Sequence, residues 1–168
     1  AYSITPNTGY SKECLASTIS SLILAVDLEC ARLLLSRDDI DINYAPKRSG
    51  KTAIHLAIVA GNLDLLRLLI KHPRTEINQA SGGGNTAMHY ASELGNLKML
   101  RLLIKHPRAK FNQENGRGKT PLHLAINGNH PNAKNTLTTA MFLLDRLLER
   151  GPGDGGQEDV VQMSIFTD

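Results

Sequence analysis

Tryptophan is absent from this chain of 168 residues, and all aromatic residues together supply only 4% of it. The apolar 41% therefore consists mainly of leucine, isoleucine and alanine, which suit the interfaces between helices. This composition favours an all-α fold. The length is sufficient for one well-buried domain and too short for two ordinary ones.

Cysteine is also scarce, because Cys14 and Cys30 are the only two. They are too few for a disulfide framework, and neither has a metal-binding spacing, so we expect reduced thiols in a cytoplasmic protein without a metal or cofactor. No apolar stretch is long enough to span a membrane, and no secretory signal is recognisable. The net charge of +3 is too small to identify a dedicated nucleic-acid-binding protein.

A period of 34 residues dominates the sequence. Residues 65–74 return as residues 99–108 with one conservative change, and residues 50–55 return as residues 84–89 and 118–123. A fixed period of this length predicts supersecondary units stacked on one another.

These copies resemble the ankyrin repeat, whose pattern is Gly-x-Thr-Pro-Leu-His-x-Ala followed by a leucine-rich second helix. Residues 118–125 contain the whole pattern, whereas Ala53 and Ala87 replace its proline in the two earlier copies. The resemblance implies an all-α solenoid of about four helix-turn-helix repeats with short β-turn loops.

The repeat boundaries follow from the period. We predict an N-terminal extension (1–14), a degenerate capping repeat (15–49), two regular repeats (50–83 and 84–117) and a C-terminal repeat (118–151). In the last repeat, aligning residues 147–148 with 102–103 needs an offset of 45 in place of 34, which predicts an inserted loop at 127–140. The glycine-rich stretch that follows predicts a flexible tail at 152–168, whose apolar run at 160–166 is either a cap or the start of further structure.

Three histidines recur at the repeat spacing, namely His55, His89 and His123. A metal site is excluded because equivalent atoms of stacked helices lie about 10 Å apart, whereas zinc ligands approach one ion to about 2.1 Å. The resemblance implies that each histidine and the threonine three residues before it connect the turn to the neighbouring helix by hydrogen bonds. No catalytic constellation is recognisable, and we expect no enzymatic activity and no small-molecule substrate.

The family resemblance implies a concave surface made of loop tips and first helices, with Tyr44 as the predicted anchor. The alternative is that these positions are ordinary solvated loop residues. The predicted partner-binding residues are Tyr44, Arg48, Ser49, Lys51, Val59, Ala60, Gln79, Asn85, Glu93, Leu94, Gln113, Arg117, Lys119 and Asn127.

A second candidate surface is a basic ridge on the second helices. The repeat alignment brings together Arg67, Arg101 and Arg146, then Lys71, Lys105 and Arg150, then Arg74 and Arg108. Such a ridge could contact an acidic protein, an anionic membrane or nucleic acid. The alternative is a solvated helix face, on which charged residues are common.

The leading hypothesis is a protein-interaction module, monomeric by itself, that binds a protein through its concave groove. The alternative is the targeting domain of a larger enzyme whose catalytic part lies outside this chain, and nucleic-acid binding through the ridge is a third hypothesis. The near-identical repeats also resemble ankyrin proteins that intracellular bacteria deliver into host cells, which implies a host protein as the partner.

Overall fold

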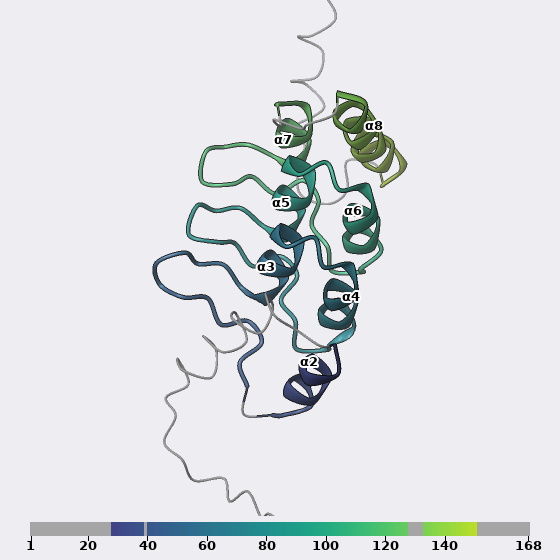
Figure 1. Cartoon of the computed structure of the whole chain (residues 1–168). Helices are drawn as coiled ribbons and strands as arrows, with labels where there is room; N and C mark the ends of the chain where they lie inside the picture. The colour runs from purple at the N-terminus through teal and green to yellow at the C-terminus, as the bar shows by residue number, and fades with distance from the viewer. Residues whose placement is uncertain (1–27, 39, 128–132, 151–168) are drawn as a thin grey trace, which may run out of the picture.

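The computed structural model describes residues 28–38, 40–127 and 133–150. In these residues the secondary structure is entirely helical, with seven helices and no strand. In chain order they are α2 (Leu28–Leu35), α3 (Ala53–Val59), α4 (Leu63–Lys71), α5 (Ala87–Glu93), α6 (Leu97–Ile104), α7 (Pro121–Asn127) and α8 (Ala133–Arg150). The helices form two columns, with α3, α5 and α7 in one and α2, α4, α6 and α8 in the other (Figure 1).

Each complete unit is a pair of antiparallel helices, and the pairs are α3 with α4, α5 with α6, and α7 with α8. Helices in equivalent positions of successive units pack on each other, as α3 does on α5 and α4 on α6. The predicted all-α helical repeat solenoid is therefore confirmed. Helix α2 occupies the place of a second helix, beside α4, whereas the first helix expected within residues 15–27 lies outside the described residues.

The core forms because the two kinds of helix contribute side chains of different size. The second helices bury leucines and a methionine at helical spacing, such as Leu66 and Leu100 with no exposed surface. The first helices contribute the fully buried alanines Ala57, Ala91 and Ala125. Small residues allow the helix backbones to approach closely, so leucine side chains fill the space between the helices and few aromatic residues are needed in the core.

An asparagine begins each regular second helix. The side-chain oxygens of Asn62 and Asn96 accept hydrogen bonds from the N–H groups of Leu65 (3.0 Å) and Met99 (3.3 Å). These bonds satisfy amides that the first turn of a helix leaves unpaired. The sequence analysis did not identify these caps, although their repetition at the 34-residue period was a usable signal.

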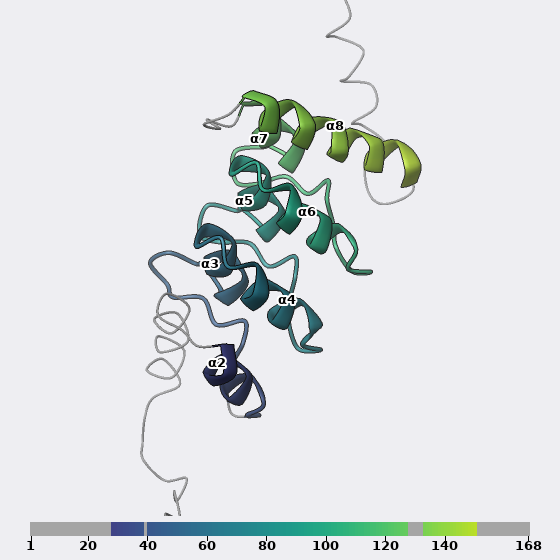
Figure 2. The same cartoon turned by 45° about the vertical axis from the view of Figure 1, so that its right-hand side comes forward.

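The prediction of a loop across 127–140 is wrong for residues 133–140, because α8 already begins at Ala133. Figure 2 shows α8 as a long helix over the end of the stack. Thr139 and Leu143 are buried and Leu147 is half-buried, which is a helical spacing of four residues. The sequence interpretation aligned Leu148 with the buried Leu103, but Leu148 is 73% exposed. The buried face of α8 begins with a polar residue, Thr139. An alignment based on leucines therefore gave this helix the wrong register.

The histidines of the His-Pro pairs that follow the second helices accept hydrogen bonds from the backbone. Burial, followed by the neighbouring Arg108, lowers the pKa of His106, which favours the neutral ring. Its Nδ1 accepts a hydrogen bond from the N–H of Arg108 (3.2 Å), and Nδ1 of His72 accepts from the N–H of Arg74 (3.3 Å). These rings therefore shape the turn after the helix as hydrogen-bond acceptors.

Candidate functional site

A threonine and a histidine fix the start of each first helix that the structure describes, α3, α5 and α7. In the second regular unit, Nδ1 of His89 accepts a hydrogen bond from the backbone N–H of Thr86 (3.1 Å) and lies 2.8 Å from the Thr86 hydroxyl. The same contacts join Thr52 to His55 and Thr120 to His123. Each histidine ring therefore has a structural role at the start of a first helix, as the sequence analysis expected.

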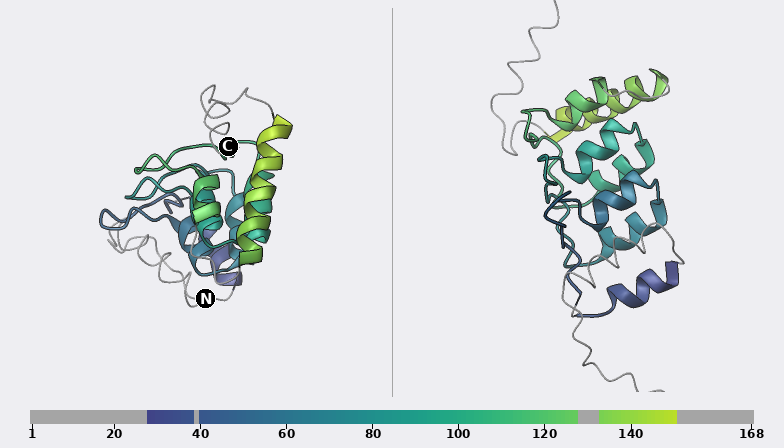
Figure 3. Two further views of the ribbon diagram at one scale, coloured as in Figure 1. Left: turned by 90° about the horizontal axis from the view of Figure 1, so that it is seen from above. Right: turned by 60° about the vertical axis from the view of Figure 1, so that its left-hand side comes forward.

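The loop before each first helix projects to one side of the stack, as Figure 3 shows. We call residues 46–51, 80–85 and 114–119 the fingers. Within a finger the chain doubles back, as where the N–H of Asn115 donates to the carbonyl of Lys119 (2.9 Å). Nε2 of His89 lies 2.9 Å from the same carbonyl, and with Nδ1 acting as an acceptor it donates this bond. His89 of the second regular unit therefore holds the finger of the next unit.

Successive fingers also bond to each other directly. The N–H of Gly82 donates to the carbonyl of Ser49 and the N–H of Gly116 donates to the carbonyl of Gly83, both at 3.2 Å. Gly84 has a φ of +77°, and a Cβ atom on it would lie 2.2 Å from the backbone nitrogen of Gly116. Glycine is therefore required at Gly84 both for the left-handed backbone conformation and for the close approach of the two fingers. The result is a continuous wall beside the first helices.

The groove between this wall and the first helices contains a hollow of about 500 Å³. Asn85, Asn115, Arg117 and Lys119 line it from the finger side, and Glu93 is at the far end of α5. Its complete lining is Gly83, Asn85, Tyr90, Glu93, Asn115, Arg117, Lys119, Leu124 and Asn127. Asn115 also donates from its side-chain amide to the Oδ1 of Asn85 (2.7 Å), which joins two fingers at the edge of the hollow.

Five of the predicted partner-binding residues come together in this hollow, and they are Asn85, Glu93, Arg117, Lys119 and Asn127. Three others lie exposed at or just after the end of α3 or α5, namely Val59, Ala60 and Leu94. Arg48, Ser49 and Lys51 belong to the first finger. Each of the predicted residues is exposed or half-buried, so each is accessible to a partner.

The remaining three predictions are not brought into this hollow. Gln113 lines a different hollow, of about 830 Å³, together with Asn78 and residues 107–112. Tyr44 and Gln79 are half-buried and line neither of these two. All three residues directly follow equivalent Ile/Phe-Asn pairs of successive repeats.

Tyr90 is one of four residues of the hollow that the sequence analysis missed, and the others are Gly83, Asn115 and Leu124. Its ring lies under Nζ of Lys51, at 5.1 Å from the ring centroid, and packs edge-on against His55 with centroids 5.4 Å apart. Its hydroxyl donates to the hydroxyl of Ser81 (3.1 Å). Leu124, which also lines the hollow, is the equivalent residue of the next unit. The large side chain that directly follows each repeat histidine was therefore the signal from which the sequence could have identified this groove position.

The paired helices, the Thr–His contacts and the stacked fingers are all repeated at the same spacing. The family model described as ankyrin repeats (3 copies) matches residues 11–81 and again residues 74–145. This chain belongs to the ankyrin-repeat family. No curated protein matches it. Ankyrin repeats are in general protein-interaction modules, and the helical stack of this chain has the corresponding architecture.

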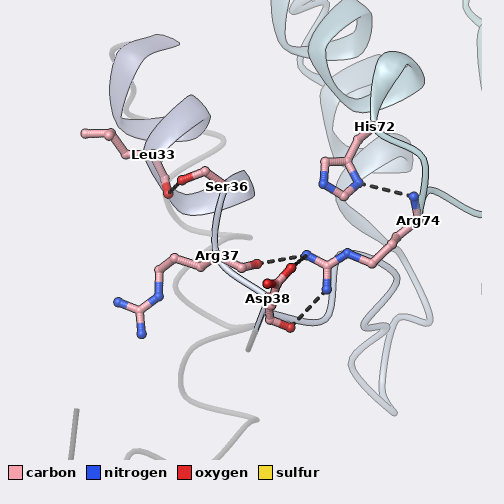
Figure 4. A network of polar contacts seen from close by, with 6 residues as sticks. All are labelled: Leu33, Ser36, Arg37, Asp38, His72 and Arg74. Carbon is pink, nitrogen blue, oxygen red and sulfur yellow. Dashed lines mark hydrogen bonds and ion pairs between the residues drawn. The ribbon is translucent and has the colours of Figure 1, made fainter.

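Two arginines of the predicted basic ridge serve the ankyrin stack itself. Arg74 donates from Nη1 to the carbonyl of Asp38 (2.9 Å) and from Nη2 to the carbonyl of Arg37 (2.8 Å), both in the preceding repeat (Figure 4). Arg108 donates in the same way to the carbonyl of Thr75 (3.3 Å). These arginines therefore connect successive repeats.

Three further arginines of the ridge, Arg67, Arg101 and Arg146, also have partners within the ankyrin repeats. Arg67 lies 3.9 Å from Asp64, and Arg146 is paired with Glu149. The guanidinium of Arg101 lies 5.4 Å from the centroid of the Phe142 ring. The alternative interpretation, a solvated and internally paired helix face, accounts for these contacts without an external ligand.

Within the described part of the chain, no group of three or more His, Cys, Asp or Glu side chains is arranged to hold a metal ion. None of the helices described is both long and apolar enough to cross a membrane.

Lowering the pH below 6.5, the ordinary pKa of histidine, should destabilise this ankyrin stack. Burial lowers the pKa of His55 from 6.5 to about 4, although the carbonyl groups of Gln79 and Asn85 partly oppose this shift. Burial also lowers the pKa of His89. The unfolded chain therefore binds more protons than the folded one between pH 6.5 and about 4, and stability falls as the pH falls through this window.

We expect His55 alone to lower the free energy of unfolding by about 2 kcal/mol between pH 7.5 and pH 5, because each pH unit within the window contributes up to about 1.4 kcal/mol. Urea unfolding followed by circular dichroism at both pH values measures this change. The pH dependence should become smaller in the variant His55→Gln. Equal stability of the unmodified chain at both pH values would contradict the assignment of neutral buried histidines.

Proposed function

We propose that this ankyrin-repeat chain binds a protein partner through the groove between the fingers and the first helices. The observation that carries the proposal is the hollow between α5, α7 and two fingers, in which five predicted binding residues converge. Its walls are held by backbone hydrogen bonds between the fingers and by the bond from His89 to Lys119. A preformed surface loses little conformational entropy on binding.

The groove also offers apolar surface beside its polar walls. Val59 and Leu94 are each 48% exposed, at or just after the ends of neighbouring first helices. Exposed apolar side chains next to fixed polar groups are typical of the centre of a protein interface. A protein segment, which carries both kinds of group, therefore suits this groove better than a small molecule.

A capture experiment with a matched pair of variants tests the proposal. The groove variant carries Glu93→Ala and Leu94→Ala, and the control carries Leu148→Ala and Glu149→Ala on the exposed surface of α8. Both variants remove one glutamate and one leucine side chain. The lysate should be eukaryotic, because the repeats resemble those of ankyrin proteins that intracellular bacteria deliver into host cells.

We expect the unmodified chain and the control variant to capture the same protein, and the groove variant to capture less than about a tenth as much. Circular dichroism and thermal unfolding of all three chains verify that the folds are equal. Equal capture by the groove variant would refute binding through this surface.

A further inference from the structure

We infer that the groove selects an extended segment of a partner protein in which two acidic clusters flank an apolar residue. This inference rests on the proposed function and specifies the chemistry of the partner. It is carried by the uneven distribution of charge over the three fingers.

The first and third fingers are cationic, whereas the middle finger is neutral. The first finger carries Lys47, Arg48 and Lys51. The third finger carries Arg117 and Lys119 together with one carboxylate, Glu114, so it is less positive than the first. The middle finger reads Ala-Ser-Gly-Gly-Gly-Asn from residue 80 to residue 85. The positive charge of the groove is therefore divided between its two ends.

Within the part of the chain that the structure describes, none of these five cationic side chains takes part in an ion pair. The contact of Lys51 is with the face of Tyr90, which leaves its ammonium group able to bind an anion. This differs from five arginines of the basic ridge, which are bonded to carbonyl groups, carboxylates or an aromatic ring, namely Arg67, Arg74, Arg101, Arg108 and Arg146. The groove cations are thus available to carboxylates of a partner.

The spacing of the fingers sets the spacing of the acidic clusters. Stacked helices lie about 10 Å apart, so the first and third fingers are separated by about 20 Å. An extended chain advances about 3.3 Å per residue, so this separation corresponds to about six residues. Leu94, 48% exposed just after the end of α5, belongs to the unit of the middle finger, which lies between the units of the two cationic fingers. A central apolar side chain of the partner would bind there.

Two fluorescent peptides of equal composition test the spacing. The first has two glutamates at each end and about four neutral residues between them, one of which is leucine. This places the centres of the acidic pairs about six residues apart. The second has all four glutamates together at one end. We expect the divided peptide to bind at least about tenfold more tightly in fluorescence anisotropy at low salt, because only it reaches both cationic fingers.

Two charge-reversal variants of the whole chain test the location. The variant Arg48→Glu with Lys119→Glu changes one residue in each cationic finger, and the variant Lys71→Glu with Lys105→Glu makes the same change of net charge on the second helices. All four positions are exposed or half-buried. We expect the finger variant to bind the divided peptide at least about tenfold more weakly than the unmodified chain does. The second-helix variant should bind it less than about twofold more weakly.

Equal binding of the two peptides, or equal loss in the two variants, would overturn the inference. Binding of duplex DNA that is lost only in the second-helix variant would also overturn it, in favour of the basic ridge. If neither peptide binds while the Glu93→Ala/Leu94→Ala variant still loses its captured protein, the inference fails and the proposed function stands. If that variant keeps its captured protein, the proposed function fails.

Discussion

Replacing Gly84 by alanine should lower the free energy of unfolding by about 3 kcal/mol or more, because two physical effects add. The positive φ of +77° costs an L-residue about 1–2 kcal/mol, and the new Cβ atom would lie 2.2 Å from the backbone nitrogen of Gly116. Because the obstacle is backbone, the fingers must separate, and the hydrogen bond from Gly116 to Gly83 is lost.

Gly61→Ala is the matched control for Gly84→Ala. Gly61 has a similar φ of +71°, but no atom of the described residues lies within 4 Å of the place that an alanine Cβ would take. This control should therefore cost only the backbone strain of about 1–2 kcal/mol. Urea unfolding of both variants gives the comparison, and equal costs would show that the close contact between fingers does not exist in solution.

Leu100→Ala should destabilise the stack by about 3–5 kcal/mol. Leu100 has no exposed surface and lies in α6, which packs against α4, α5 and α8. Truncation removes the transfer free energy of the lost atoms and leaves a cavity that rigid neighbours cannot fill. Alanine itself favours the helix, so the loss must come from packing.

The same substitution at Leu148 provides the control, because Leu148 is 73% exposed on α8. We expect Leu148→Ala to change the free energy of unfolding by less than about 0.5 kcal/mol. Thermal unfolding of both variants measures the difference. A small effect at Leu100 would contradict its placement in the core. A large effect at Leu148 would show that α8 has a different register.

The regular part of the fold could be predicted because one period controls several levels of structure. The spacing of Thr52, Thr86 and Thr120 located the first helices, and the glycine two residues before each threonine located the fingers. Local conformation, capping and packing agree at these positions, and such agreement is what makes a pattern reliable.

The last repeat was predicted less well because its sequence gives conflicting signals. Thr139 is buried where a leucine or methionine was expected, so the alignment followed the leucines at 147–148 and placed the start of the second helix too late. Periodicity identifies a helix face only when the buried residues are apolar. A fully buried threonine therefore moved the predicted register.

The candidate site could be predicted at the level of surfaces, but not of individual contacts. Five groove residues were identified from their repeat positions, whereas Tyr90 was missed and Gln113 lines another hollow. The ridge arginines illustrate the same limit. Their repeat positions grouped Arg74 and Arg108 as exposed cations, but only the three-dimensional structure reveals that they donate to carbonyl groups of the preceding repeat.

Photo-crosslinking tests the role of the groove most directly. A photoreactive residue in place of Asn85 or Arg117 lies in the hollow, whereas the same residue in place of Lys71 or Lys105 lies on the second-helix side. The account predicts that the first two positions crosslink one captured protein in a eukaryotic lysate and that the last two do not. Crosslinking of that protein from Lys71 and Lys105, with none from Asn85 and Arg117, would contradict it.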